Sequence, residues 1–137
     1  MKIFHSDAYQ LNLPARHTFP IEKYRLLRER IQASGLVADD RLAAAPAVGD
    51  ADILRVHDAD YIERLEQGRL TDREIRRIGF PWSPQLVRRA KHSVGATLAA
   101  ARAALAEGLG IHLGGGTHHA FPDHGQGYCV LNDVAIA

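Results

Sequence analysis

An α/β domain with a mostly parallel sheet is the fold that the sequence predicts. Short apolar runs that resemble strands alternate along the chain with stretches of helical spacing, and this order is typical of α/β architecture. The 137 residues, 46% of them hydrophobic and 24% charged, suffice for one core of moderate size. Three or four strands make a thin sheet with an open edge, and such an edge is normally paired or covered. We therefore expect residues 1–137 to be the N-terminal part of a single larger domain.

The first elements follow from apolar spacing. Residues 2–4 predict a short strand, and residues 18–34 predict a helix in which Pro20 suits the first turn. The alanine-rich stretch 42–50 is expected to be a surface connection. Residues 53–57 are β-branched and alternating, which predicts a second strand.

Helix-capping residues locate the next two elements. Asp58 or Asp60 can cap a short helix. Its inner face carries three apolar residues: Tyr61, Ile62 and Leu65. Thr71 and Glu74 have the spacing of a capping box and open another short helix, which Gly79 ends.

A long helix, a strand and a final cap complete the chain. Ser83 followed by Pro84 is a strong helix start. One apolar stripe follows at helical spacing: Leu86, Ala90, Val94, Leu98, Ala101 and Leu105. Residues 109–113 predict a third, buried strand, and residues 132–133 cap a helix that has barely begun at Ala137.

The composition excludes several classes of protein. A net charge of +1 argues against a nucleic-acid binder, because phosphate contacts require a basic surplus. No apolar run approaches the roughly 18 residues that a membrane span needs. Cys129 is the only cysteine, which excludes an internal disulfide and a cysteine-only zinc site. This lone cysteine and the missing signal sequence predict a cytoplasmic protein.

The loop after the third predicted strand is the first place to look for chemistry. In open α/β sheets the ligand site lies beyond the carboxyl ends of the strands. Residues 114–129 hold three of the eight histidines, an aspartate and the only cysteine. Three successive glycines permit close backbone approach. The adjacent His118 and His119 can act as general base and general acid, because imidazole titrates near neutral pH.

Other interpretations of these residues stay open. The glycine run is a weak candidate for a phosphate cradle, because no Lys-Ser/Thr pair and no immediate helix follow it. A direct metal site is an alternative, although the spacing fits no standard zinc motif. Its ligands would come from five residues: His118, His119, Asp123, His124 and Cys129. We interpret Cys129 as a small buried residue and His57 and His92 as structural histidines. Three residues remain divided between a site role and ordinary packing: His5, Phe80 and Trp82.

Residues 115–137 combine four short blocks in order, with short spacings between them: Gly-Gly, His-His-Ala, Gly-Tyr-Cys and Asn-Asp-Val-Ala. This string resembles the central signature of the histone deacetylase superfamily. Earlier blocks look like class IV-type bacterial members: residues 16–20 with Lys23 and Tyr24, residues 55–62 and residues 78–84. The resemblance covers nearly the whole chain but only the first part of a family domain.

The resemblance implies a fold and an activity. The fold would be the three-layer α/β/α arginase/deacetylase type with a parallel sheet, here incomplete. The activity would be that of a zinc-dependent hydrolase that removes acyl groups such as acetyl from amide nitrogen, as in acetyl-lysine. Its substrate would be an acylated lysine or a polyamine-type small molecule, with no nucleic acid and no membrane as partner.

The resemblance also implies site residues. His118 and His119 match the tandem catalytic histidines, with His119 as general base and then acid. Gly127 matches the backbone position that contacts the acyl group. Tyr128 matches the aromatic wall of the substrate tunnel, which is phenylalanine in many members. Lys23 falls near a basic position at the inner end of the pocket.

The zinc ligands of the family are expected downstream of Ala137, so no metal ligand is assigned within this chain. A catalytic zinc needs three protein ligands and an open position. We therefore predict that the 137-residue chain alone is inactive. Two alternatives to an enzyme remain: a truncated non-catalytic fragment or partner-binding module, and a small independent metal-binding protein.

Overall fold

A small parallel sheet lies at one end of the molecule in the computed structural model, which describes residues 1–9 and 11–137. The sheet has the order β2-β1-β3. Its strands are β1 (Lys2–His5), β2 (Leu42–Ala44) and β3 (Gly110–His112). Ile3 of β1 is paired in parallel with Leu42 on one side and with Ile111 on the other. The predicted α/β class with a parallel sheet is confirmed.

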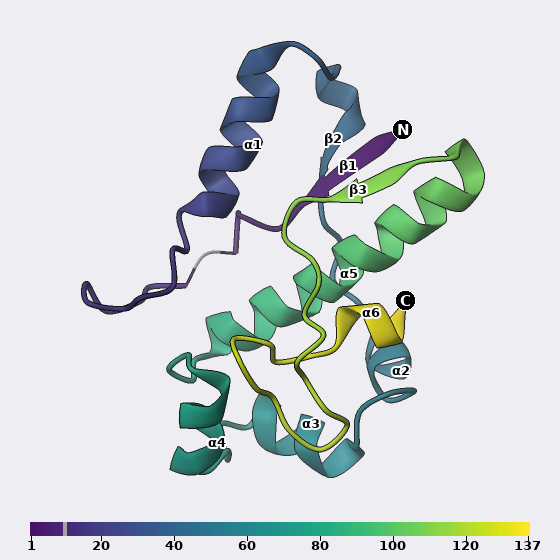
Figure 1. Cartoon of the computed structure of the whole chain (residues 1–137). Helices are drawn as coiled ribbons and strands as arrows, with labels where there is room; N and C mark the ends of the chain where they lie inside the picture. Colours follow the sequence, from purple (N-terminus) through teal and green to yellow (C-terminus); the bar gives the residue numbers. More distant parts are fainter. Residues whose placement is uncertain (10) are drawn as a thin grey trace.

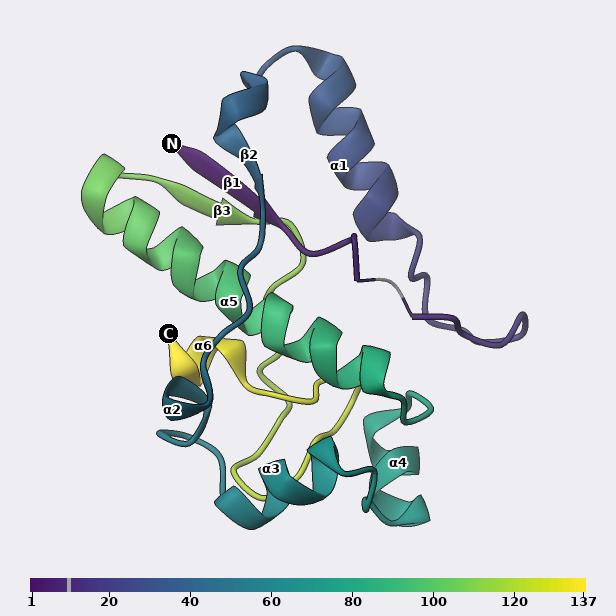
Figure 2. The ribbon, with the colours of Figure 1, turned by 180° about the vertical axis from the view of Figure 1, so that it is seen from behind.

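Six helices and one 3-10 turn connect and flank these strands: α1 (Lys23–Ser34), η1 (Asp39–Arg41), α2 (Asp50–Ile53), α3 (Ala59–Glu66), α4 (Asp72–Ile78), α5 (Pro84–Glu107) and α6 (Asp133–Ile136). The C-terminal half of α5 packs against β1 and β3, and α1 lies on the other side of the strands (Figures 1 and 2). Helices α2, α3, α4 and α6 lie below α5 in Figure 1, on the side away from the sheet. No described helix is long and apolar enough to cross a membrane.

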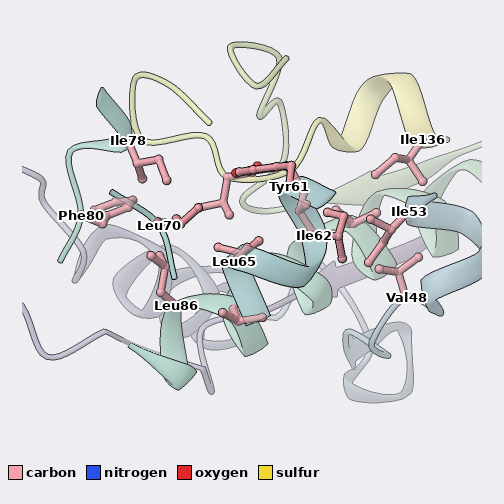
Figure 3. Packing of buried hydrophobic residues seen from close by; sticks show 14 of the residues in the cluster. Val48, Ile53, Tyr61, Ile62, Leu65, Leu70, Ile78, Phe80, Leu86 and Ile136 are labelled. Atoms are coloured by element: carbon pink, nitrogen blue, oxygen red, sulfur yellow. The ribbon is translucent and has the colours of Figure 1, made fainter. Parts of the chain in front are cut away.

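The apolar core lies between α3, α4, α5 and the chain that precedes α6 (Figure 3). Its most buried side chains include Ile53, Tyr61, Leu65 and Ile78, each at most 1% exposed. The Tyr61 hydroxyl donates a hydrogen bond of 2.9 Å to the carbonyl of Val130. The core therefore joins the helical layer to the segment that leads into α6.

The predicted helix ends are largely confirmed. Thr71 and Glu74 form the capping box of α4, and the Ser83 side chain accepts a hydrogen bond at the start of α5. Asp58 occupies the N-cap position of α3, although its side chain makes no capping bond. The apolar stripe of α5 stops before Leu105, which is 90% exposed and was wrongly placed on the inner face.

The predicted strand at residues 53–57 is wrong. Residues 50–53 form α2, and the amides of Val56 and His57 then donate to the carbonyl of Ile53, which continues a helical turn. Ile53 and His57 are buried and Val56 is partly buried, so the inward positions are i, i+3 and i+4. Over only five residues, this helical spacing resembles the alternation of a strand.

Two further boundaries differ from the prediction. Residues 42–44 form strand β2 beside β1, where we expected only a surface connection. Alanine carries little strand signal, so the backbone pairing of β2 with β1 decides this element. The first helix begins at Lys23, five residues after the predicted start at Thr18, so Pro20 precedes it.

Candidate active site

The loop between β3 and α6 carries most of the candidate site residues. It leaves the carboxyl end of β3, runs along α5 to α3 and returns to α6 (Figure 1). This is the place at which an open parallel sheet holds its ligand site. Because the path of the loop is long, its backbone needs contacts that hold it in place.

Asp133, at the start of α6, anchors the beginning of this loop. Its side chain is 0% exposed. One carboxylate oxygen accepts hydrogen bonds from the Thr97 hydroxyl at 2.6 Å and the Gly116 amide at 2.9 Å, and the other accepts from the Thr117 amide at 2.7 Å. Burial opposes the charge, but these hydrogen bonds outweigh burial and hold the pKa of Asp133 below its ordinary value. The carboxylate acts as an internal anion that organises the loop.

The glycine run does not form the phosphate cradle that was the weaker alternative. The amides of Gly116 and Thr117 are already bonded to the carboxylate of Asp133. At Gly115 an added Cβ would lie 2.6 Å from His112 Nδ1 and 3.0 Å from an Asp133 oxygen. Glycine is needed there because the loop backbone lies directly against these polar groups.

His112, at the end of β3, is a buried histidine that sequence reasoning missed. The Thr97 hydroxyl has one proton and donates it to Asp133, so it accepts from His112 Nδ1 at 2.9 Å. This leaves His112 Nε2 as a lone pair that is buried without a partner among the described residues. Burial lowers the pKa of His112 to about 4, although the charge of Asp133 acts to raise it. The imidazole is therefore neutral at physiological pH.

The tandem histidines lie side by side but face different surroundings. The rings of His118 and His119 have centroids 4.2 Å apart and planes inclined by 41°. His118 Nδ1 is bonded to the carbonyl of Gly116 at 2.9 Å, and this residue does not line the cavity described below. His119 does line it, close to the backbone of Gly127.

A cavity of about 250 Å³ opens between the start of α1, the N-terminal half of α5 and the loop. It is lined by four of the five predicted site residues: Lys23, His119, Gly127 and Tyr128. Tyr24, Phe80 and Arg89 also line this cavity. The predicted residues lie in three separate segments of the sequence, and the fold brings them to one cavity.

The C-terminal end of α4 holds the Gly127–Tyr128 wall in place. The Gly127 amide donates to the carbonyl of Arg77 at 3.0 Å, and the Tyr128 amide donates to that of Ile78 at 2.7 Å. Tyr128 has a φ of 66°, a left-handed conformation that costs a non-glycine residue about 1 kcal/mol. Free carbonyls at a helix end need donors. The loop supplies these donors, which explains why the strained backbone is kept.

Aromatic rings fix the orientation of the Tyr128 side chain. Its ring centroid lies 4.9 Å from that of Phe19 and 5.0 Å from that of Phe80. Its hydroxyl lies 3.3 Å from the Thr18 hydroxyl, within hydrogen-bonding distance. Phe80 is thus both buried and part of the cavity wall, whereas Trp82 is a packing residue whose indole N–H donates to the carbonyl of Leu65 at 2.7 Å.

Two cationic groups, Lys23 and Arg89, also line the cavity. Lys23 Nζ lies 4.8 Å from the centroid of the Phe19 ring and 5.0 Å from that of Tyr24. The guanidinium of Arg89 lies 4.6 Å from the Tyr24 centroid. Sequence reasoning missed Arg89, although it follows the buried Leu86 by three positions on the same helix face.

His57, His92 and Cys129 make contacts within the fold, in agreement with the structural roles expected for them. His57 is buried between the carbonyl of Pro122 and the amide of Asn132, and burial lowers its pKa. His92 is bonded to the carbonyl of Ala45 at 2.8 Å. His5, whose role the sequence leaves open, pairs with Asp7 at 2.6 Å. The buried thiol of Cys129 has a raised pKa, because burial disfavours the thiolate.

The alternative of a metal site in the histidine loop is not supported by the geometry. Within residues 1–9 and 11–137 there is no group of three or more His, Cys, Asp or Glu side chains placed to hold a metal. His124 is paired instead with its neighbour Asp123 at 2.6 Å and stacked on Phe121. A zinc ion would need ligands in addition to the ones that these residues supply.

Known proteins resemble this chain in sequence along nearly its whole length. A protein-family model described as the histone deacetylase domain matches residues 17–137. An uncharacterized protein of Picosynechococcus sp. is 41% identical over 98% of this chain and 45% of its own length. A histone deacetylase-like amidohydrolase of Pseudomonas aeruginosa is 34% identical over 90% of this chain and 33% of its own length. The chain thus spans less than half the length of these relatives.

Solved structures show the same fold. An HDAC homolog from Aquifex aeolicus has a TM-score of 0.76 at 20% identity, covering 98% of this chain and 39% of the other. An HDAC homolog complexed with SAHA has a TM-score of 0.75 at 23% identity, covering 99% of this chain and 39% of the other. The incomplete α/β arginase/deacetylase-type fold expected from the sequence is confirmed. With a family model matched over most of its residues, the chain belongs to the histone deacetylase domain family.

Proposed function

We propose that this chain provides the substrate-binding wall and the proton-transfer histidine of a hydrolase that removes acyl groups from amide nitrogen. The observation that carries this proposal is the convergence of His119, Gly127 and Tyr128 on one cavity. The Pseudomonas relative is named an amidohydrolase, which agrees with this reaction. An acylated lysine or a polyamine-type small molecule is the proposed substrate, and a cytoplasmic location accompanies it.

His119 performs the proton transfers in this proposal. It accepts a proton from a water molecule while the water oxygen bonds to the amide carbonyl carbon, and it returns a proton to the departing nitrogen as the C–N bond breaks. His118 lies beside it at 4.2 Å and is held through Nδ1 by the Gly116 carbonyl, so it acts as the electrostatic partner. The ring of Tyr128 contacts the aliphatic part of the substrate.

The zinc that the family resemblance implies is not bound by the described residues alone, because they form no group of three ligands. We therefore propose that the 137-residue chain has no activity of its own. Purified chain supplied with zinc should release no more amine from acetyl-lysine than a metal-free control does. Zinc-dependent turnover by the chain would contradict this part of the proposal.

Substrate binding tests the cavity directly. Nε-acetyl-lysine titrated into the labelled chain should shift the NMR signals of the Gly127 amide and the His119 ring. Tyr128→Ala should weaken binding by about fivefold or more, because it removes the aromatic wall. Phe121→Ala is the matched control, since Phe121 is 48% exposed on the same loop and does not line the cavity. Shifts confined to other residues would refute this assignment of the cavity.

A non-catalytic fragment or partner-binding module is the second candidate, favoured by the lack of a three-ligand group among the described residues. The DNA sequence beyond the Ala137 codon separates the two. An in-frame continuation with Asp-x-Asp-x-His would support the enzyme, and an immediate stop codon would support the second candidate.

A further inference from the structure

We propose that Arg89 forms a carboxylate-binding subsite in the same cavity, and that the acyl group this site accepts ends in a carboxylate, as a succinyl group does. This inference rests on the proposed function, because it assigns the acyl group of the amide substrate. Three observations carry it: the burial of Arg89, the lack of an anionic partner for it among the described residues, and its place in the cavity wall.

Arg89 is a buried cation in the N-terminal half of α5. The residue is 9% exposed, whereas its neighbour Arg88 is exposed to solvent. A guanidinium remains protonated even where burial lowers its pKa, as it does here. Burial of such a charge is unfavourable unless the charge is paired. The position therefore calls for an anion.

No such anion is found within the part of the chain that the structure describes. The Nη1 atom of Arg89 is buried and has no hydrogen-bond partner there. Asp133, the fully buried carboxylate of the loop, is already bonded to Thr97, Gly116 and Thr117. The guanidinium carbon of Arg89 lies over the Tyr24 ring, 4.6 Å from its centroid, and Tyr24 is a neutral partner. The unpartnered Nη1 is therefore available to donate to an anionic acceptor.

The chemistry of the guanidinium selects a carboxylate. A guanidinium donates two parallel N–H bonds to the two oxygens of a carboxylate, and this pairing is stronger than a neutral hydrogen bond. Lys23, exposed on the same cavity, adds a second positive charge. An acetyl group has no anionic oxygen that could form an ion pair with either cation.

The cavity places Arg89 and the reacting group within one space. His119, Gly127 and Arg89 all line the same cavity of about 250 Å³. Leu86 and Leu131 line it as well and provide apolar surface for a short methylene chain. An acyl group with a distal carboxylate can thus place its amide at the histidine and its charge at Arg89.

Binding to the 137-residue chain tests the inference without requiring catalysis. Nε-succinyl-lysine, Nε-acetyl-lysine, acetate and succinate are each titrated and followed by the Nε–H signal of Arg89 and the Gly127 amide. We expect succinyl-lysine to bind about tenfold or more tightly than acetyl-lysine. Arg89→Gln should remove this preference, and Arg88→Gln, the exposed neighbour, should keep it. Arg89→Lys is the second variant, for use if Arg89→Gln fails to fold. It keeps the positive charge but loses the paired N–H donors of the guanidinium, so only part of the preference should remain.

The titrations separate the carboxylate subsite from its alternatives. Equal affinity for the two acylated lysines in the unaltered chain would overturn the inference, and so would a preference that survives in folded Arg89→Gln. If acetate binds at Arg89 but succinyl-lysine binds no more tightly than acetyl-lysine, the subsite binds the carboxylic acid that the reaction releases. That result would overturn the assignment of the acyl group. Binding of succinate that depends on Arg89, with neither lysine derivative bound, would support the carboxylate subsite and contradict the amide substrate of the proposed function.

Discussion

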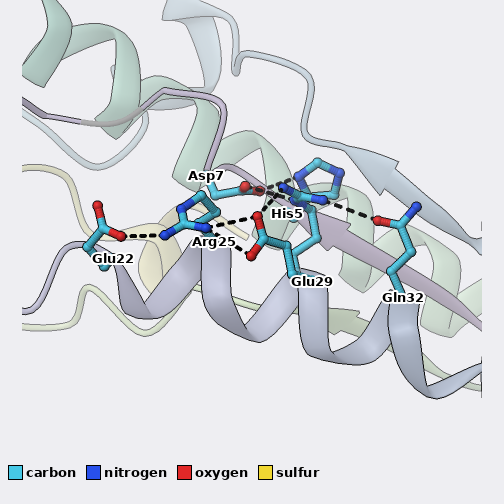
Figure 4. A network of polar contacts seen from close by, with 7 residues as sticks. His5, Asp7, Glu22, Arg25, Glu29 and Gln32 are labelled. Carbon is cyan, nitrogen blue, oxygen red and sulfur yellow. Dashed lines mark hydrogen bonds and ion pairs between the residues drawn. The ribbon is translucent and has the colours of Figure 1, made fainter.

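Helix α1 and the α3–α4 layer are held in place by different forces. All residues of α1 are described, and none of its side chains is buried. Its polar contacts include the ion pair of Arg28 with Asp7, the buried carboxylate two residues after β1, at 2.8 Å. Figure 4 shows Asp7 beside this helix. In α3 the inner face consists of apolar side chains that are at most 6% exposed: Tyr61, Ile62 and Leu65. The start of α1 lines the cavity directly, whereas α4 acts on it through the Gly127–Tyr128 wall, so the cavity depends on both kinds of interaction.

The two regions are joined mainly by the segment that precedes α1. His17 Nε2 donates to the carbonyl of Gly79, just after α4, at 2.8 Å, and Thr18 lies next to the Tyr128 hydroxyl. The ring of Phe19 packs on both Phe80 and Tyr128. A change in the α3–α4 layer should therefore unfold the molecule, whereas a change in α1 should loosen one cavity wall.

Leu65→Ala is the change for which we expect the largest effect. Leu65 is 1% exposed in the core, and removal of its side chain should lower the free energy of unfolding by about 2–5 kcal/mol. Leu26→Ala on α1 is the matched control, because Leu26 is 53% exposed and its loss should cost less than about 1 kcal/mol. Urea unfolding of both variants measures the difference. Equal losses would mean that α1 has an apolar interface after all.

Asp133→Asn should have the next largest effect, because it acts on the loop that carries the histidines. An amide group would point its own N–H toward a donor that now bonds the carboxylate, and we expect a loss of about 2–3 kcal/mol. Asp123→Asn, on an exposed carboxylate of the same loop, should cost much less. Urea unfolding at pH 7 measures both, and similar values would show that Asp133 does not anchor the loop.

The pH dependence gives Asp133 a second readout. The pKa of Asp133 lies below its ordinary 3.8, so its contribution to stability is complete above that pH and is lost as the pH falls through the lower, folded-state value. The unaltered chain should lose stability in this acid range, and Asp133→Asn should lose less of it. If both proteins lose the same free energy of unfolding as the pH falls, Asp133 does not have the proposed role in stability.

Arg28→Ala tests the polar attachment of α1 and should have a smaller effect. The variant leaves the carboxylate of Asp7, which is 6% exposed, with His5 alone, and we expect a loss of about 1–2 kcal/mol. The loss should be accompanied by faster amide exchange in α1 than in α3. Uniform acceleration in both helices would mean that the two regions unfold as one unit.

Much of the fold could be predicted from local sequence signals. The capping box at Thr71 and the Ser83-Pro84 start predicted the correct starts of α4 and α5, because a cap is decided by residues within one turn. Residues 42–44 could not be predicted, since their strand exists only through pairing with β1. Residues 53–57 were misassigned because a five-residue window does not separate a period of two from the end of a helix.

The candidate site was predicted where the residues are adjacent in sequence and missed where the fold assembles them. The His118-His119 pair and the Gly127-Tyr128 pair stand out as short motifs. Arg89 and His112 carry no motif, and only burial distinguishes Arg89 from the exposed Arg88 beside it. Asp133 was expected only as a helix cap, yet its side chain bonds to amides seventeen and sixteen residues earlier in the chain.

Arg25→Ala should have the smallest effect on stability of all these variants. Arg25 nevertheless forms ion pairs with two glutamates close to it in the sequence. Arg25 contacts Glu22 and Glu29, and all three side chains are well exposed (Figure 4). Exposed pairs are screened by water and salt and must restrain long side chains, so they contribute little to global stability. We expect an unchanged urea midpoint for the chain and a small, salt-dependent loss of protection confined to α1. If Arg25→Ala destabilises the chain as much as Arg28→Ala does, then surface charge in general, rather than the single contact with buried Asp7, attaches α1 to the sheet.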